Sequence, residues 1–460
     1  MDKPALLRQL PQVDELLRRP EVVALLETEP RRLVVAAARE VLAARRQAIL
    51  ASQPVDLAPA VLVSEVEQRV RRAAAPRLRP VLNATGVVVH TNLGRSLLAE
   101  EAIQRVVLAA TSYTNLEFDL DRGERGSRHS LIEELLCTVC GAEAGFAVNN
   151  NAAAVFLVLA ELACGRDVIV SRGELVEIGG SFRIPDVMAA SGATLREVGT
   201  TNRTRLADYE RAISPQTAMI LKVHQSNFAV VGFTAQAAVA ELAALAHERG
   251  LTMAEDLGSG SLIDFSRYGL KAEPTVQGSL AAGADLVTFS GDKVLGGPQA
   301  GVIVGRKALI ERLKCHPLAR ALRLDKMTLA ALEATLRLYL DEAQALARIP
   351  TLRMILASEA LLERRARRLA RLIRQKAPAF SVSVVDSAGR VGGGALPIED
   401  LPGQAVALRH PQRSAAELEA ALRAQEPPLI GRIERDTLLL DVRTLADDEL
   451  PLVAEVVARA

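Results

Sequence analysis

The chain of 460 residues is poor in cysteine and in aromatic residues. Four cysteines are too few for a disulfide framework in a chain of this length, and they favour a reducing compartment. Cys137 and Cys140 form a C-x-x-C pair, but no second pair completes a zinc site, so we expect two buried helix cysteines. Tryptophan is absent and aromatic residues make up 3% of the chain, which leaves few side chains for stacking on nucleic acid bases.

Long hydrophobic runs are also missing. The longest, residues 152–164, is interrupted by Glu161 and is too short to span a bilayer. No positively charged leader precedes an apolar stretch at the N-terminus, so a secretory signal is not expected. These features predict a cytoplasmic protein without a membrane-spanning segment.

The chain as a whole has no excess of charge of either sign, since its net charge is +1. Its distribution is uneven, because residues 1–80 hold 14 Lys and Arg against 10 Asp and Glu, whereas the remaining residues have a net charge of −3. A mildly basic segment is weak support for a polyanionic partner, since a solvated helical face explains it equally well. The hydrophobic content of 49% is sufficient for two or three domains with cores of their own.

The order of apolar patterns predicts an α/β protein with a helical segment on its N-terminal side. Residues 1–72 show helical spacing interrupted by prolines, and residues 73–83 are typical of a linker. Residues 84–335 alternate short apolar runs with helices, which indicates βαβ units and a mainly parallel sheet. Residues 336–460 are expected to form a small α+β domain. The individual predictions are strands at 167–170, 217–223, 251–254 and 286–289, helices at 327–347 and 358–376, and a hairpin of 430–433 with 437–442.

A lysine on a glycine-flanked turn is the first candidate for chemistry. Residues 284–289 form an apolar strand, and Ser290-Gly-Asp-Lys293 follows directly. Parallel sheets bind ligands at the carboxyl ends of their strands, where Lys293 would emerge. A lysine desolvated there, close to another cation, has a lowered pKa and can form a Schiff base with pyridoxal phosphate (PLP). An exposed lysine in a surface turn is the alternative for this motif taken alone.

Two further segments supply what PLP requires. Asp256 follows the strand at residues 251–254, and a carboxylate there can hold the pyridine nitrogen protonated, while Glu255 would point to the other face. Asn149, Asn150 and Asn151 lie between a strand end and a strong helix start, where backbone N–H groups bind phosphate. Helix capping is the competing explanation for Asp256 and for one of the asparagines.

Arginines near two other segments indicate an anion site. Arg95 ends the segment Thr91-Asn-Leu-Gly-Arg95, and Arg320 and Arg323 are three residues apart. If residues 316–323 are helical, Arg320 and Arg323 share one face and can clamp a phosphate-like group.

Taken together, these segments resemble the bacterial selenocysteine synthase family, the L-seryl-tRNA(Sec) selenium transferases. The resemblance extends over most of the chain in a fixed order. The matching segments are NATGVVVHTNLGR (83–95), VNNNAAA (148–154), SRGELVEIGG (171–180), GTTNR (199–203), DLGSGS (256–261), FSGDK (289–293) and KMTLAALE (326–333).

The resemblance implies the aspartate-aminotransferase-like PLP fold, fold type I, with an N-terminal tRNA-binding domain at residues 1–72 and assembly as a ring of dimers, a decamer. It further implies that Lys293 carries PLP, that Asp256 pairs with the pyridinium nitrogen, and that Arg95, Arg320 and Arg323 bind selenophosphate. Ser290 and His224, with the three asparagines, complete the expected cofactor contacts. The implied reaction converts seryl-tRNA(Sec) to selenocysteinyl-tRNA(Sec) by loss of the β-hydroxyl and addition of selenium.

Alternatives remain at this point. Relatives of the family that lack the N-terminal domain share the lysine and the aspartate, so a PLP lyase acting on a free amino acid or amino sugar is the nearest alternative. Ser290-x-x-Lys293 also has the spacing of penicillin-binding acyltransferases, but the chain lacks their S-D-N and K-T-G elements. A non-catalytic tRNA-binding scaffold would leave Asp256 and Lys293 unexplained. No aromatic residue follows Glu174 where many PLP enzymes stack a ring on the cofactor, and His224 to Asn227 is active-site lining without an assigned role.

Overall fold

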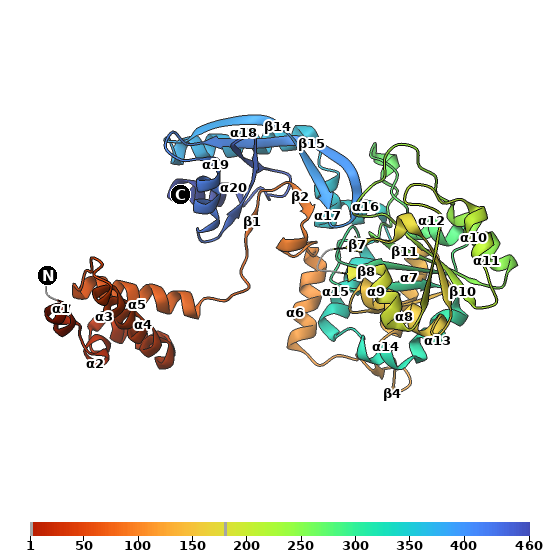
Figure 1. The fold of residues 1–460 in the computed structure, drawn as a ribbon, viewed down its shortest axis with the longest axis horizontal. Helices are drawn as coiled ribbons and strands as arrows, with labels where there is room; N and C mark the ends of the chain where they lie inside the picture. Colours follow the sequence, from red (N-terminus) through yellow and green to blue (C-terminus); the bar gives the residue numbers. More distant parts are fainter. Residues whose placement is uncertain (1–2, 179–181) are drawn as a thin grey trace. The chain divides into compact units, whose positions relative to one another are not determined.

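The computed structural model describes residues 3–178 and 182–460 (Figure 1). The chain divides into two compact units, Met1–Pro80 and Val81–Ala460, which are considered one at a time. The last two residues of the segment 171–180 lie outside the described residues.

The N-terminal unit is a small bundle with a core of its own. Pro20 and Pro59 are the first residues of their helices, where a missing N–H costs nothing. The core is aliphatic, and Val34, Val41 and Val66 are fully buried in it. The helices are α1 (Lys3–Gln9), α2 (Val13–Leu17), α3 (Pro20–Thr28), α4 (Arg31–Leu50) and α5 (Pro59–Ala74).

The second unit is built on a seven-stranded sheet in the order β5-β13-β12-β11-β10-β6-β9. Neighbouring strands are parallel except at β13, which is antiparallel to both β12 and β5. The mainly parallel sheet predicted from the alternating pattern is confirmed. The strands are β5 (Ala144–Val148), β6 (Asp167–Ser171), β9 (Thr194–Val198), β10 (Thr217–Val223), β11 (Thr252–Gly258), β12 (Leu286–Ser290) and β13 (Gly301–Gly305).

Helices cover this sheet, and its central strands are therefore buried along their length. The helices of this part are α6 (Glu100–Thr111), α7 (Ser130–Cys140), α8 (Asn151–Leu162), α9 (Ile184–Ser191), α10 (Leu206–Ala212), α11 (Val239–Glu248), α12 (Val276–Ala281), α13 (Lys307–Cys315), α14 (Pro317–Ala321), α15 (Lys326–Leu338), α16 (Glu342–Arg348) and α17 (Pro350–Ile355). Short elements between them are η1 (Thr91–Leu93), β3 (Phe118–Asp119), β4 (Glu124–Arg125), η2 (Arg172–Glu174), β7 (Glu177–Ile178), β8 (Phe182–Arg183) and η3 (Phe265–Tyr268).

Two sequence predictions in this part need adjustment. The helix expected at 327–347 is two helices, because the side chain of Asp341 accepts hydrogen bonds from the backbone N–H groups of Ala343 and Gln344 and so starts α16. Cys137 and Cys140 lie on α7 as expected, but Cys137 is only partly buried.

The C-terminal part forms a five-stranded sheet in the order β17-β18-β15-β14-β2. The predicted hairpin is confirmed as β17 paired with β18. Residues 87–89, expected at the start of the large domain, pair in parallel with β14, and residues 82–83 of the expected linker pair with β16. The elements are β1 (Leu82–Asn83), β2 (Val87–Val89), α18 (Glu359–Lys376), β14 (Ser381–Gly392), β15 (Ala395–Arg409), α19 (Ala415–Arg423), β16 (Leu429–Ile430), β17 (Arg432–Glu434), β18 (Thr437–Asp441) and α20 (Leu450–Arg459).

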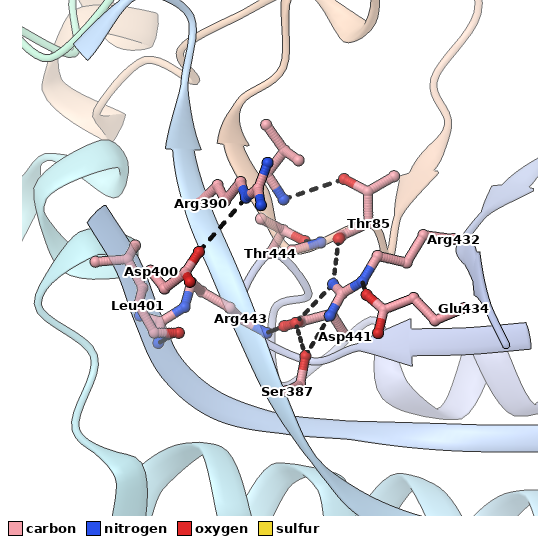
Figure 2. A network of polar contacts seen from close by, with 12 residues as sticks. Thr85, Ser387, Arg390, Asp400, Leu401, Arg432, Glu434, Asp441, Arg443 and Thr444 are labelled. Carbon is pink, nitrogen blue, oxygen red and sulfur yellow. Dashed lines mark hydrogen bonds and ion pairs between the residues drawn. The ribbon is translucent and has the colours of Figure 1, made fainter. Parts of the chain in front are cut away.

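A buried polar network holds the middle of the β14–β15 hairpin (Figure 2). The carboxylate of Asp441 accepts hydrogen bonds from Ser387 Oγ at 2.6 Å, from Arg432 Nη1 at 3.0 Å and from the backbone N–H of Arg443 at 3.0 Å. Gly86 has φ +77°, and a Cβ there would lie 2.5 Å from Asp441 Oδ2. The network therefore requires both this aspartate and a bare backbone beside it.

The guanidinium of Arg443 ties β15 to α17. It is 2% exposed and donates to the carbonyl oxygens of Met354 at 2.7 Å and Pro402 at 2.6 Å, with longer bonds to Ile355 and Leu401. Burial lowers the pKa of this guanidinium. A charged group is stable here because carbonyl oxygens replace its water.

Across residues 3–178 and 182–460, no helix is long and apolar enough to cross a membrane.

Candidate active site

Asp256 and Lys293 come together at the carboxyl ends of neighbouring strands. Asp256 lies within β11, which runs to Gly258 rather than ending at Ala254 as predicted, and pairs with Thr288 of β12. Lys293 lies three residues beyond the end of β12. Both side chains are buried, with exposed fractions of 3% and 6%. The predicted juxtaposition is present in the structure.

The surroundings of Lys293 shift its amine toward the neutral form. Burial lowers the pKa of Lys293, because desolvation penalises the ammonium. The charge of Asp256 opposes this shift, and the charge of Arg95 adds to it. A buried amine of lowered pKa is the nucleophile that Schiff-base formation requires.

Asp256 is a desolvated carboxylate with neutral hydrogen-bond donors. Asn151 Nδ2 donates to Asp256 Oδ1 at 2.8 Å, and Thr288 Oγ1 donates to the same oxygen at 3.3 Å. Burial raises the pKa of Asp256 in spite of these bonds. Glu255 points to the other face of β11, as alternation along a strand dictates, and its pKa is also raised by burial.

The three asparagines have separate contacts. Asn150 is the N-cap of α8 and accepts from the backbone N–H of Ala153 at 2.9 Å, as the capping explanation requires. The backbone N–H of Asn149 donates to the carbonyl of Leu322 at 2.9 Å, whereas the side chain of Asn151 reaches Asp256. The N-terminus of α8, with its partial positive charge, therefore lies next to the aspartate.

Arg95 is held near Lys293 by Asp292, the residue that precedes the lysine. Arg95 Nη1 donates to Asp292 Oδ2 at 2.6 Å, and the backbone N–H of Ser96 donates to the carbonyl of Asp292 at 3.3 Å. The Arg95 side chain is 36% exposed, so part of the guanidinium is accessible at the edge of the site. The sequence indicated this arginine without its partner.

The expected helical pairing of Arg320 and Arg323 is wrong. Helix α14 ends at Ala321, so Arg320 lies in its last turn while Arg323 lies beyond it and forms a β-bridge with Val148. Arg323 Nη1 donates to Glu117 Oε1 at 3.3 Å. A five-residue helix is too short to place both arginines on one face, although Arg323 does lie next to the strand that leads into the asparagines.

His224 and Ser290 both lie at strand ends next to this site. The backbone N–H of His224 donates to the carbonyl of Asp256 at 2.9 Å, and its Nε2 lies 3.2 Å from Glu273 Oε1. Ser290 is the last residue of β12 and is buried. A cavity of about 240 Å³ lies next to His224. Its lining comes from segments that are far apart in the sequence and includes Lys222, Glu273 and Leu396.

Sequence reasoning missed two residues of the site, Glu273 and Gly394, and it gave no role to Ser226. A Cβ on Gly394 would lie 3.2 Å from Lys293 Nζ and 3.0 Å from Ser226 Oγ, so Gly394, Ser226 and Lys293 lie together. Ser226 belongs to a segment that the sequence indicated without a role. Glu273 and Gly394 carry no local signal, because only the tertiary fold brings them to the lysine.

The buried polar atoms around Lys293 fit PLP. Asn151 Oδ1 and Ser226 Oγ are buried and, among the described residues, have no hydrogen-bond partner. Asp256 is a buried carboxylate, and a protonated ring nitrogen would supply the positive charge that its neutral donors do not. The donor set is that of an organic cofactor with a phosphate and a basic ring nitrogen.

Two family models match the chain, and together they leave little of it uncovered. The model described as L-seryl-tRNA selenium transferase matches residues 81–446, and the model of the selenocysteine synthase N terminal matches residues 7–46.

Several curated proteins are similar to this chain over almost their whole length. The L-seryl-tRNA(Sec) selenium transferase of Geobacter sulfurreducens is 55% identical, with 97% of each chain covered. That of Solidesulfovibrio magneticus is 55% identical, covering 99% of this chain and 98% of the relative, and that of Clostridium botulinum is 49% identical with the same coverage.

Among solved structures, D-glucosaminate-6-phosphate ammonia-lyase is similar, with a TM-score of 0.58 and 22% identity over 83% of this chain and 96% of that chain. This likeness concerns the fold. With the sheet topology, it agrees with the predicted fold type I architecture, which is confirmed. Because matches of this identity extend over nearly the full chain, the protein belongs to the L-seryl-tRNA(Sec) selenium transferase family, the PLP-dependent selenocysteine synthases.

Proposed function

We propose that the chain converts seryl-tRNA(Sec) to selenocysteinyl-tRNA(Sec), with selenophosphate as the selenium donor and Lys293 and Asp256 as the central catalytic residues. The observation that carries the proposal is the buried pair itself: an amine of lowered pKa next to a desolvated carboxylate at the carboxyl ends of parallel strands. Family membership supports the reaction, and the pair supports the assignment of roles.

Each residue has a defined task in this proposal. PLP, when bound, supplies an electron sink for negative charge at the substrate Cα. Asp256 holds the proton on the ring nitrogen, and Asn151 orients Asp256 through its 2.8 Å hydrogen bond. The N-terminus of α8 binds the phosphate. Lys293 Nζ binds the cofactor and then takes the proton from Cα of the seryl group, a role that a lowered pKa favours.

Arginine side chains are proposed to bind selenophosphate. Arg95 is the best supported, because its half-exposed guanidinium is fixed by Asp292 beside the lysine. Arg323 and Arg320 follow from the family resemblance, and they would have to act from separate elements. Planar donor groups of this kind match the oxygens of a phosphate-like anion.

The helical N-terminal unit is proposed to bind the tRNA. It is the mildly basic part of the chain, and it has a hydrophobic core of its own. With aromatic residues at 3%, recognition should rest on RNA shape and phosphates rather than on base stacking. We further propose a homo-oligomer, a decameric ring of dimers, that acts in the cytoplasm.

The assignment of Lys293 is tested by cofactor attachment. Purified protein mixed with PLP should show a visible absorbance band, and borohydride reduction should leave the cofactor on the peptide that contains Lys293. Lys293→Ala should lose both signals and all transferase activity, because Lys293 is the lysine whose charge acts on Asp256. Lys307→Ala, at an exposed helix start, is the matched control and should keep them. Attachment at another lysine in the wild type would refute the assignment.

The substrate is tested separately. The holoenzyme should form a selenocysteinyl product from seryl-tRNA(Sec) and selenophosphate, and it should not release ammonia from free serine or an amino sugar. Turnover of a free amino acid at a comparable kcat/KM would favour the lyase alternative.

A further inference from the structure

The tip of the β14–β15 hairpin reaches the lysine. Gly392, Gly393 and Gly394 connect the two strands, and all three have left-handed φ values of 73°, 57° and 83°. A Cβ on Gly393 would lie 2.3 Å from Val89 Cγ1, so the turn is packed tightly against β2. Only glycine adopts three such conformations in succession without strain.

Gly394 faces the chemistry directly. A Cβ on it would lie 3.0 Å from Ser226 Oγ and 3.2 Å from Lys293 Nζ. Gly258, at the end of β11, borders the same two atoms, at 3.4 Å and 3.8 Å from its own Cβ position. The amine of Lys293 therefore lies in a compartment whose walls are the backbones of two glycines and the hydroxyl of Ser226.

Polar contacts hold the hairpin in this position at two places along its length. At the tip, Glu273 Oε2 accepts from the backbone N–H of Leu396 at 3.4 Å, while its Oε1 contacts His224. Leu396 has a φ of 46°, a strained value for leucine. In the middle of the hairpin, Asp441 bonds to Ser387 of β14 and Arg443 bonds to Pro402 of β15 (Figure 2). The turn is thus a fixed part of the site and not a loose loop.

We propose that the turn at residues 392–394 is a wall of the active site, and that the missing side chain of Gly394 keeps open the space that the Lys293 amine needs to bind PLP. The inference rests on the proposed role of Lys293. It assigns to the C-terminal sheet, 100 residues beyond the lysine in sequence, a direct part in cofactor attachment.

A pair of glycine variants distinguishes obstruction of the Lys293 amine from the backbone strain that any alanine at a positive φ causes. Gly394→Ala adds a methyl group between Ser226 Oγ and Lys293 Nζ at a φ of +83°. Gly269→Ala adds the same methyl at a φ of +81°, where nothing lies within 4 Å. The two variants bear the same conformational penalty, and only the first obstructs the amine.

The experiment measures PLP affinity of the full-length protein by absorbance titration, with borohydride labelling of Lys293 and thermal unfolding of the cofactor-free forms. We expect Gly394→Ala to weaken PLP binding by about tenfold or more, as for an overpacked site. Gly269→Ala should bind PLP as the wild type does, and the unfolding temperatures of the two variants should agree. Ser226→Ala combined with Gly394→Ala should recover part of the affinity, because it removes the nearest atom to the new methyl.

The outcomes are distinct. Equal PLP affinity of the two glycine variants, whether both normal or both weak, would overturn the wall, as would a double variant no better than Gly394→Ala. If Gly394→Ala fails to fold, Ser226→Val is used in its place, since it also crowds the amine, and normal PLP binding by it overturns the proposal. A wild type that is not labelled at Lys293 would instead refute the proposed function.

Discussion

At the scale of single residues, the site depends on two charges buried close together with opposite shifts. Burial lowers the pKa of Lys293 and raises that of Asp256, so each group is pushed toward its neutral form. Their mutual attraction opposes both shifts. Bound PLP changes this balance, because a protonated ring nitrogen beside Asp256 favours the carboxylate while the lysine amine is consumed.

The pH dependence of cofactor attachment follows from this arrangement. PLP attaches to the neutral amine, so the attachment rate should rise with pH and then reach a plateau. The midpoint of this rise should lie below pH 10.5, the ordinary pKa of lysine. Arg95→Gln removes a nearby positive charge and frees the carboxylate of Asp292, and both changes favour the ammonium. The midpoint of this variant should therefore move to higher pH, as measured by stopped-flow absorbance.

Arg122→Gln, in an exposed turn, serves as the control and should leave the midpoint unchanged. A midpoint for Arg95→Gln that stays in place or moves to lower pH would contradict the assigned influence of Arg95 on the lysine.

Part of the site is predictable from the sequence. Lys293 and Asp256 each follow an apolar strand, and the geometry of parallel sheets then brings them to one edge. Arg323 could not be placed, because the short α14 ends before it and a β-bridge fixes it instead. Gly394 and Glu273 were out of reach for a different reason: their contacts are made across the fold, and glycine in a turn has the same local signature wherever the turn lies.

At the scale of elements, strand interiors are predictable and their ends are less so. The strand β10 has the predicted limits, because most of its residues are apolar and buried. The strand β11 continues past Ala254 through Glu255 and Asp256, whose polar character hides a buried strand from any hydropathy pattern. The end of a strand is predicted wrongly where the chemistry of the site requires polar residues inside the sheet.

The C-terminal sheet should depend strongly on Arg443. Arg443→Met keeps much of the side-chain volume but leaves the buried carbonyls of Met354 and Pro402 without their donor. We expect a loss of about 1–3 kcal/mol in the free energy of unfolding, the range for leaving a buried hydrogen-bond acceptor without its donor. Urea unfolding followed by circular dichroism measures it.

Arg390→Met is the matched control. Arg390 lies on the same hairpin, and its ion pair with Asp400 is 3.5 Å long with both side chains largely exposed (Figure 2). Exposed pairs contribute about 0–1 kcal/mol, so this variant should unfold close to the wild type. Similar losses in the two variants would contradict the special role of Arg443.

At the scale of the whole molecule, the N-terminal unit should be separable. Its buried aliphatic residues pack among themselves, and residues 1–80 form a compact unit of their own. A variant that begins at Val81 should therefore fold, bind PLP and show the same absorbance band, yet lose most of its affinity for seryl-tRNA(Sec). Filter binding of the tRNA at several salt concentrations measures this loss. Unchanged tRNA affinity would refute the proposed role of the unit.

The class of fold and the sheet direction follow from the sequence, but the connection of distant segments does not. Alternating strands and helices imply parallel pairing, whereas the antiparallel direction of β13 in the seven-stranded sheet and the pairing of β2 with β14 have no local signal. These pairings depend on which edges remain open after the central strands have assembled.

The position of β2 bears on how the protein is made. Residues 82–89 leave the ribosome long before β14 and β16, the strands with which they pair. The N-terminal helices can complete their core early, but β2 must wait unpaired through most of translation. The newborn chain thus holds an open strand edge until its last quarter emerges, which is the interval in which a molecular chaperone would have most to protect.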